Sequence, residues 1–280
     1  MIESGGVRLC AEAFGDPGDP PVLLIMGMAG SMLWWDERFC RALAGGGRFV
    51  IRYDHRDTGR SQAWEPGRPG YTGDDLVADA ARVLDAFGIA AAHVVGVSMG
   101  GALAQVFALD HPDRVLSLGL MSTSPAGPGD GLPGPDTAYL EAVAAASVDP
   151  DDPRSVVEGV VAESRALAGR ERTFDEAAAR ALAERDVARA DSFASARNHA
   201  EVEGGDPWRH RLGAIAVPTL VVHGTADPLF PIEHGVALAA EIPGARLMRL
   251  EGAGHGLDPA DHDTVARAIL AHTAGASGPA

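Results

Sequence analysis

Short apolar segments alternate with helical patterns along most of the chain, and this alternation constrains the fold more than any other feature. Four of these segments are rich in Val and Leu: Arg48 to Tyr53, Ala92 to Val97, Val115 to Met121 and Thr219 to His223. Because they are almost continuously apolar, they are typical of strands covered on both faces. Helical patterns lie between them, such as the one that Thr72 can cap and that ends before Gly88. The sequence therefore predicts an α/β fold with a mostly parallel central sheet and helices on both faces.

The N-terminal region contains two more candidate strands, Val7 to Phe14 and Pro21 to Met26. The turn-rich sequence Gly15-Asp16-Pro17-Gly18-Asp19-Pro20 separates them, so we expect the two strands to form a hairpin. Near the other end of the chain the alternation continues with a helix, a strand and a last helix. These are a helix from about Ile232, a strand near Arg246 to Leu250 and a helix from about Asp261 to Thr273.

The alternation lapses between about Pro125 and Pro207. A Pro/Gly-rich loop is followed there by Ala- and Glu-rich segments that favour helices. We therefore expect residues 1–124 and 208–280 to form one core, and residues 125–207 to form a helical lid inserted into it.

The pentapeptide Gly96-Val97-Ser98-Met99-Gly100 directly follows an apolar strand and directly precedes a predicted helix, Met99 to Leu109. The pattern Gly-x-Ser-x-Gly is weak by itself, since a Gly-rich turn can hold a serine by chance. The strand–turn–helix context favours a nucleophile elbow, a tight turn that presents a serine hydroxyl above the sheet. Such a turn leaves no room for side chains on either side of it, which explains the glycines. Ser98 is therefore the candidate nucleophile.

A serine hydroxyl is a poor nucleophile at neutral pH and needs a base that is oriented by a third group. His255 lies in a Gly-rich loop after the last predicted strand, and Asp227 lies in a turn after the strand Thr219 to His223. We expect His255 to be the general base and Asp227 to orient it. Asp130 and Glu251 are less suitable acids.

The other histidines have structural interpretations. His93 and His223 lie at strand ends, and His111 precedes a proline at the end of a helix. Five more fall on predicted helices or their edges, where we expect solvated side chains: His199, His210, His234, His262 and His272.

A tetrahedral intermediate on Ser98 would need two N–H donors for its oxyanion. The residue after the nucleophile, Met99, supplies one, and Met28 in the loop after the strand Pro21 to Met26 supplies the other. Trp34 and Trp35 follow this loop, and they either pack in the core or line an apolar acyl pocket.

The polar run from Tyr53 to Ser61 also follows a strand. It has neither a phosphate-binding Walker pattern nor the spacing of a histidine pair that binds a metal. We interpret it as a structural loop whose charges satisfy one another.

Composition excludes some classes of partner. The formal net charge of −16 opposes binding to nucleic acid, which requires a basic surface. No segment is long and apolar enough to span a membrane, and no signal-peptide pattern is visible. We therefore expect a cytoplasmic protein without a nucleic-acid or membrane partner. No motif calls for a metal or a cofactor, and the oligomeric state is left open.

These motifs together resemble the α/β-hydrolase superfamily across nearly the whole chain. The similar segments are Tyr53 to Ser61, His93 to Gly100, Val217 to Val221, Asp227-Pro228 and Gly254-His255. Within the superfamily, Asp54 to Ser61, Met26-Gly27 and Asp130 to Pro135 resemble the aclacinomycin methylesterase family, whose members cleave a methyl ester from an anthracycline. The resemblance implies a helical lid over the triad. It also implies catalytic roles for Ser98, Asp227 and His255, with Met28 and Met99 as oxyanion donors. The chain departs from this family at Met28-Ala29-Gly30 and in the lid after Tyr139.

The first hypothesis is therefore a serine carboxylic ester hydrolase that forms an acyl-enzyme. Its substrate would be a small-molecule ester, with a methyl ester of a polyketide-like or other small apolar compound as one candidate. The same triad also fits a cofactor-free haloperoxidase or perhydrolase, a lactonase or a C–C bond hydrolase, because fold alone does not choose among them. A non-catalytic ligand receptor is the third hypothesis. Haloalkane dehalogenases and epoxide hydrolases are disfavoured, because they have Asp where this chain has Ser98.

Overall fold

Seven strands form the central sheet in the computed structural model, which describes residues 1–125, 131–203 and 207–275. Their spatial order is β3-β5-β4-β6-β7-β8-β9. The bounds are β3 Ala11–Phe14, β4 Pro21–Ile25, β5 Phe49–Tyr53, β6 Ala92–Val97, β7 Val115–Met121, β8 Thr219–Gly224 and β9 Arg246–Leu250. Within this sheet β3 pairs antiparallel with β5, and every other neighbouring pair is parallel. The expected mostly parallel α/β sheet is confirmed.

The expected N-terminal hairpin is wrong. β3 pairs with β5, with Phe14 opposite Val50, whereas β4 takes β5 and β6 as its neighbours. After β4 the chain crosses over through a helix and returns as β5, which then lies between β3 and β4. The hairpin at this end of the chain is a separate one, formed by β1 (Ile2–Ser4) and β2 (Val7–Leu9).

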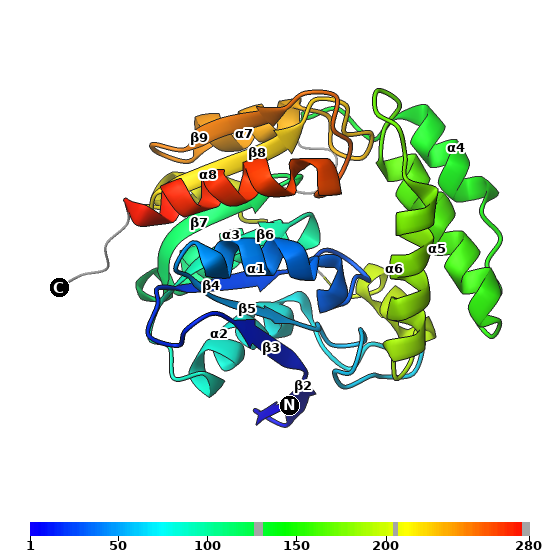
Figure 1. The fold of residues 1–280 in the computed structure, drawn as a ribbon, viewed down its shortest axis with the longest axis horizontal. Helices are drawn as coiled ribbons and strands as arrows, with labels where there is room; N and C mark the ends of the chain where they lie inside the picture. The colour runs from blue at the N-terminus through cyan, green and yellow to red at the C-terminus, as the bar shows by residue number, and fades with distance from the viewer. Residues whose placement is uncertain (126–130, 204–206, 276–280) are drawn as a thin grey trace.

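Helices cover both faces of the sheet because alternate residues of each strand point to opposite sides. Leu23, Ile51 and Val94 face one core with α2, α3 and α7, while Val22, Val50 and Val95 face the other with α1 and α8. Figure 1 shows α1 and α8 together in front of the sheet. The helix bounds are α1 Glu37–Gly45, α2 Gly73–Ala86, α3 Met99–Asp110, α7 Glu233–Glu241 and α8 His262–Ala274, with short 3₁₀ turns η1 Met32–Trp34, η2 Pro112–Arg114 and η5 Pro259–Asp261.

The helix caps follow from local chemistry. Thr72 and Asp75 form a capping box at the start of α2, in which each side chain bonds to the other residue's backbone N–H. Gly88 adopts a φ of 70° after that helix ends, a left-handed conformation that glycine adopts without strain. Both ends of α2 thus lie where the sequence predicts them.

Further helices lie between β7 and β8 in the sequence. They are α4 Thr137–Ala145, α5 Pro153–Leu167, α6 Glu176–Arg189, η3 Ala194–Ala200 and η4 Arg209–Ala214. Figure 1 shows α4, α5 and α6 grouped beyond the ends of the parallel strands. α5 and α6 pack on each other through a small apolar cluster of Val157, Val161 and Ala183. The lapse in the strand–helix alternation therefore corresponds to a group of helices.

The parallel strands end at one edge of the sheet, so the loops that follow them meet there. The direction in which successive strands are added to the sheet reverses between β4 and β6. The strand that follows β4 in the chain, β5, lies on one side of β4, and the next strand, β6, lies on the other side. In open α/β sheets, ligands bind outside the carboxyl ends of the strands at such a point of reversal. The loops that carry Met28 and Ser98 follow these two strands.

Candidate active site

Ser98 lies at the turn between β6 and α3 with a φ of 54° and a ψ of −122°. This conformation costs a residue with a side chain on the order of 1–3 kcal/mol. Surrounding hydrogen bonds hold it, because Ser98 N–H donates to the Met121 carbonyl at 2.9 Å and Thr123 Oγ1 donates to the Ser98 carbonyl at 2.8 Å. A strained serine held at the carboxyl end of a central strand is the geometry of a nucleophile elbow.

The flanking glycines are sterically required. A Cβ built on Gly96 would lie 2.1 Å from the Gly100 carbonyl oxygen, and one on Gly100 would lie 2.2 Å from the Ile25 oxygen. Both obstacles are backbone atoms that cannot rotate away. The expectation that this turn leaves no room for side chains is confirmed.

The structure brings Asp227 and His255 together. Asp227 Oδ2 accepts a hydrogen bond from His255 Nδ1 at 2.9 Å. Asp227 Oδ1 accepts bonds from the Leu229 and Phe230 N–H groups, also at 2.9 Å, so the carboxylate has a fixed orientation. Because Nδ1 donates, Nε2 is the ring nitrogen that can accept a proton.

Asp227 is 4% exposed, and its ionised form is nevertheless favoured. Burial acts to raise the pKa of Asp227, but the adjacent His255 and the hydrogen bonds to the carboxylate lower it below its ordinary value. The carboxylate therefore stays charged beside the imidazole.

β7 connects the serine turn to the histidine loop. Thr123, just after β7, bonds to the Ser98 carbonyl, and the neighbouring Ser122 Oγ accepts the Gly256 N–H at 3.1 Å. Within the described residues no hydrogen bond joins Ser98 Oγ to His255. Catalytic hydrogen bonds are often long before substrate binds and tighten in the reactive complex.

The two expected oxyanion donors flank Ser98. A Cβ built on Gly27 would lie 3.2 Å from Ser98 Cβ and 3.9 Å from Ser98 Oγ, so the backbone that precedes Met28 lies beside the hydroxyl. Met99 is the first residue of α3, where N–H groups lack an intrahelical partner. In the described part of the chain neither amide makes a hydrogen bond. Both are available to an oxygen next to Ser98.

Trp34 and Trp35 lie in different surroundings. Trp35 is 1% exposed and stacks on Phe39 in the core, with 5.8 Å between ring centroids. Trp34 is half-buried, and its Nε1 donates to Asp186 on α6 at 2.8 Å. Ser31 Oγ donates to the same carboxylate. The core-packing interpretation therefore holds for Trp35, whereas Trp34 lies between the loop after β4 and α6.

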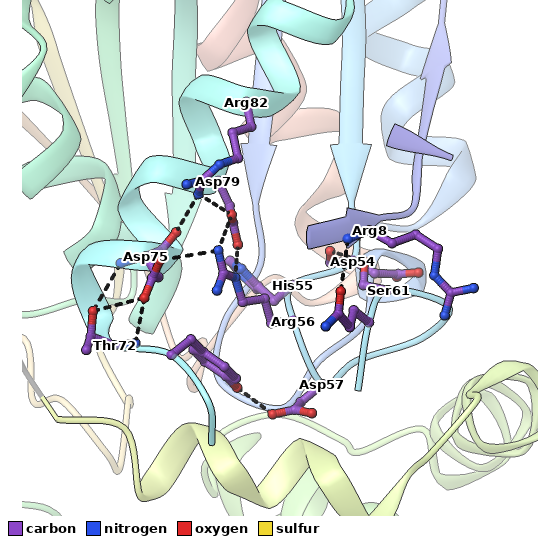
Figure 2. A network of polar contacts seen from close by, with 12 residues as sticks. Arg8, Asp54, His55, Arg56, Asp57, Ser61, Thr72, Asp75, Asp79 and Arg82 are labelled. Carbon is purple, nitrogen blue, oxygen red and sulfur yellow. Dashed lines mark hydrogen bonds and ion pairs between the residues drawn. The ribbon is translucent and has the colours of Figure 1, made fainter. Parts of the chain in front are cut away.

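The polar run from Tyr53 to Ser61 is a structural network (Figure 2). Arg56 points from the loop toward α2, where Asp79 accepts from its Nε at 2.7 Å and from its Nη2 at 2.9 Å. Asp54 accepts the Met32 N–H at 2.9 Å, and Asp57 accepts the Tyr71 hydroxyl at 2.7 Å. The charged side chains of this loop pair with groups outside it, Arg56 with Asp79 on α2 and Asp54 with Arg189 on α6. The loop is structural as predicted, but the prediction that its charges satisfy one another is wrong.

Residues between β7 and β8 also hold the histidine loop. The His255 N–H donates to the Leu167 carbonyl at the end of α5, at 2.7 Å. Arg172 Nε donates to the Glu251 carbonyl at 3.1 Å, and its Nη1 pairs with Asp261. Glu251 and Asp261 lie at the two ends of the loop, so one side chain joins both ends.

Of the alternative acids, Glu251 bonds to Thr225 and not to His255, and Asp130 lies outside the described residues.

The expectation of solvated histidines on helices is wrong at four of five positions. His199, His234, His262 and His272 are 2–7% exposed, and only His210 is exposed. Three of these rings, those of His199, His234 and His272, bond to backbone or side-chain groups of distant segments, and the ring of His262 packs against Phe39. A local pattern does not reveal such contacts. His199 in particular contacts the loop after β4, where Ala29 N–H donates to its Nδ1 at 2.9 Å.

Within the described residues, no group of three or more His, Cys, Asp or Glu side chains is arranged to hold a metal ion. No helix in the same part of the chain is long and apolar enough to cross a membrane.

Comparison with known proteins identifies the family. A family model described as the alpha/beta hydrolase fold matches residues 20–257. Rhodomycin D methylesterases DauP of Streptomyces sp. (strain C5) and DnrP of Streptomyces peucetius are each 36% identical over 293 residues, covering 99% of this chain and 98% of theirs. A solved esterase from Exiguobacterium antarcticum has a TM-score of 0.80 at 22% identity, covering 98% of each chain. The chain therefore belongs to the α/β-hydrolase fold family.

Proposed function

We propose that the chain is a serine carboxylic ester hydrolase that works through an acyl-enzyme. The observation that carries the proposal is the strained Ser98 on the same sheet edge as the hydrogen-bonded pair of Asp227 and His255. Full-length similarity to two methylesterases supports ester hydrolysis over haloperoxidase, perhydrolase, lactonase or C–C hydrolase chemistry with the same residues. The complete set of triad side chains also argues against a non-catalytic receptor. The proposal requires no metal or cofactor.

In the proposed mechanism, Ser98 Oγ attacks the ester carbonyl carbon while its proton passes to His255 Nε2. Asp227 stabilises the resulting imidazolium through the bond to Nδ1. Collapse of the tetrahedral intermediate breaks the bond to the alcohol oxygen, which leaves with the proton from Nε2. Water then attacks the acyl-enzyme with the same histidine as base, releasing the acid and restoring Ser98.

We assign the oxyanion hole to the N–H groups of Met28 and Met99. The support is their position on either side of Ser98 and the lack of another hydrogen bond to either group in the described residues. Removal of one such donor costs about 10²–10³ in kcat in well-studied hydrolases.

Residues 125–207 form, in this proposal, a lid that selects the substrate. The N–H of Asp136, the cap of α4, donates to the Pro228 carbonyl at 2.7 Å, so α4 begins beside the turn that carries Asp227. The pKa of Tyr139 on α4 is raised by burial and by the carboxylates of Glu163 and Asp227. This tyrosine therefore lies near enough to Glu163 and Asp227 to sense their charges.

Apolar side chains are exposed on the loop after β4 and on α4, which supports an apolar substrate. Met28 beside Ser98 is 53% exposed, and Leu140 and Val143 on α4 are 50% and 45% exposed. We propose a methyl ester of a polyketide-like or other small apolar compound, as the similarity to rhodomycin D methylesterases suggests.

Cys10 and Cys40 are free thiols, which supports a cytoplasmic location as part of the proposal.

The test combines a fluorophosphonate probe, a panel of methyl and p-nitrophenyl esters, and a monochlorodimedone assay for halogenation. The probe should label Ser98, and Ser98→Ala should lose labelling and on the order of 10⁴–10⁶ of the esterase turnover while keeping its fold. Ser117→Ala is the control, since Ser117 is buried and bonds to His93 at the opposite end of the strands. A Ser98→Ala variant that keeps a tenth of the activity would contradict the assignment.

A further inference from the structure

We propose that His199 is a positioning residue for the oxyanion hole, which holds the Met28–Ala29 peptide so that the Met28 N–H faces the developing oxyanion. The inference rests on the proposed function, and it assigns a role to a residue outside the catalytic triad. His199 lies in η3, about 170 residues along the chain from the loop it contacts.

The hydrogen bonds of His199 define its tautomer. Ala29 N–H can only donate, so Nδ1, at 2.9 Å, is the acceptor. The Arg56 carbonyl can only accept, so Nε2, at 2.7 Å, carries the proton. The ring thus bridges the loop after β4 and the Tyr53–Ser61 network. Both nitrogens are bound to backbone groups, so His199 is not available as a general base.

The neutral state of this ring is favoured by its surroundings. His199 is 4% exposed. Burial lowers the pKa of His199 to about 4, and a positive charge on His55, whose ring centroid lies 5.8 Å away, would act in the same direction. A protonated imidazole could not accept the Ala29 N–H, so the bridge is intact at neutral pH.

The loop needs this bond because its own conformation is unfavourable. Ala29 adopts a φ of 58°, a left-handed conformation that is unfavourable for a residue with a side chain. The bond that closes the turn, from Gly30 N–H to the Gly27 carbonyl, is long at 3.4 Å. The Met28 side chain is 53% exposed and gives little packing anchorage.

The other anchors of the loop act at its ends. His55 Nε2 bonds to the Met26 carbonyl at 2.9 Å, and Asp54 accepts the Met32 N–H at 2.9 Å. Between them, His199 holds the Ala29 N–H, which belongs to the peptide unit next to the Met28 N–H. The φ and ψ angles of Met28 set the relative orientation of the Gly27–Met28 and Met28–Ala29 peptide units. Loss of the bond would let the Met28–Ala29 peptide rotate and misdirect the oxyanion donor.

Two isosteric substitutions separate the two bonds of His199. His199→Asn places Oδ1 near the position of Nδ1, which keeps an acceptor for Ala29 N–H and loses the donor to Arg56. His199→Gln places Nε2 near the position of the ring Nε2, which keeps the donor to Arg56 and loses the acceptor for Ala29. A role in positioning the loop predicts that kcat depends on the first bond, whereas a role in anchoring η3 to the core predicts dependence on the second.

We expect His199→Asn to keep kcat within about threefold of wild type, and His199→Gln to lose on the order of 10–10²-fold in kcat with KM nearly unchanged. Affinity for phenylboronic acid, whose tetrahedral adduct with Ser98 would place an oxygen in the hole, should fall in parallel with kcat. His93→Gln is a matched control. His93 is 1% exposed with a pKa also lowered to about 4, chiefly by burial, yet it lies at the opposite end of β6. Its loss should lower Tm without lowering kcat.

Three results would overturn the inference. They are equal losses of kcat in His199→Asn and His199→Gln, an effect on KM without an effect on kcat, and changes in kcat that follow Tm in these two variants and in His93→Gln. Amide exchange in ¹⁵N-labelled wild-type protein tests it without any substitution, because Ala29 N–H should be protected although it lies in a loop. Exchange of Ala29 at the unprotected rate would overturn it even if His199→Gln fails to fold. Wild-type protein that is not labelled by fluorophosphonate would instead refute the proposed function, and the inference with it.

Discussion

Asp79→Asn should cost far more stability than a typical change of one side-chain atom. Asp79 is fully buried in α2 and accepts two hydrogen bonds from Arg56 and one from Arg82 Nη1 at 2.8 Å. The Arg56 side chain is itself 6% exposed. Asn has one acceptor oxygen, and its NH₂ group would face guanidinium donors, so the Arg56 charge would remain buried without its counter-ion.

The magnitude follows from these contacts. Removal of one partner of a buried ion pair costs about 3–5 kcal/mol. Asp75 lies 3.4 Å from Arg56 Nη2 and keeps its charge, but its side chain is 38% exposed and compensates only in part. We therefore expect a loss of about 3 kcal/mol in the free energy of unfolding. At roughly 2 °C per kcal/mol for a chain of this size, Tm should fall by about 6 °C.

Urea unfolding followed by tryptophan fluorescence measures this loss. Asp110→Asn is the matched control, because Asp110 pairs with Arg211 with both side chains more than 40% exposed. An exposed pair contributes about 0–1 kcal/mol. The double variant Arg56→Met with Asp79→Leu, which removes both charges, should recover much of the stability. If Asp79→Asn costs no more than Asp110→Asn, the Arg56–Asp79 pair is not the anchor that the geometry indicates.

Four further predictions concern activity. Activity should fall at acid pH, because a protonated His255 cannot accept the serine proton, whereas Asp227, whose pKa is lowered, stays ionised. The Asp227 charge stabilises the imidazolium, so Asp227→Asn should lower kcat about 10⁴-fold and move the acid side of the pH–activity profile to lower pH. A shift of the profile to higher pH would contradict the role assigned to Asp227. Arg172→Met should lower kcat about 10-fold with little change in KM, since the histidine loop loses the side chain that joins its ends, whereas the exposed Arg170→Met should match wild type. Exchange of residues 125–207 for those of a related hydrolase should change relative kcat/KM across an ester panel and preserve labelling of the nucleophile; unchanged relative rates in a folded chimera would locate selectivity in the core.

Much of the fold could be predicted because its signals are local. Continuous apolar segments indicate strands covered on both faces, and Thr72 and Gly88 mark the ends of α2 through their own capping chemistry. The turn around Ser98 could be predicted for the same reason, since its glycines are required by backbone atoms a few residues away and by the adjacent strand. The pairing of β3 could not, because strand partners are chosen by segments that return from elsewhere in the chain.

The nucleophile, its expected base and acid, and the two oxyanion donors were assigned from their positions after strands, since parallel strands bring the loops at their carboxyl ends to one edge. What holds those loops in place depends on contacts between distant segments. His199 supports the loop after β4, and Leu167 and Arg172 hold the loop that carries His255. A buried histidine and a solvated one look alike in a helical pattern, because burial depends on the surface that faces the residue and not on its neighbours in the chain.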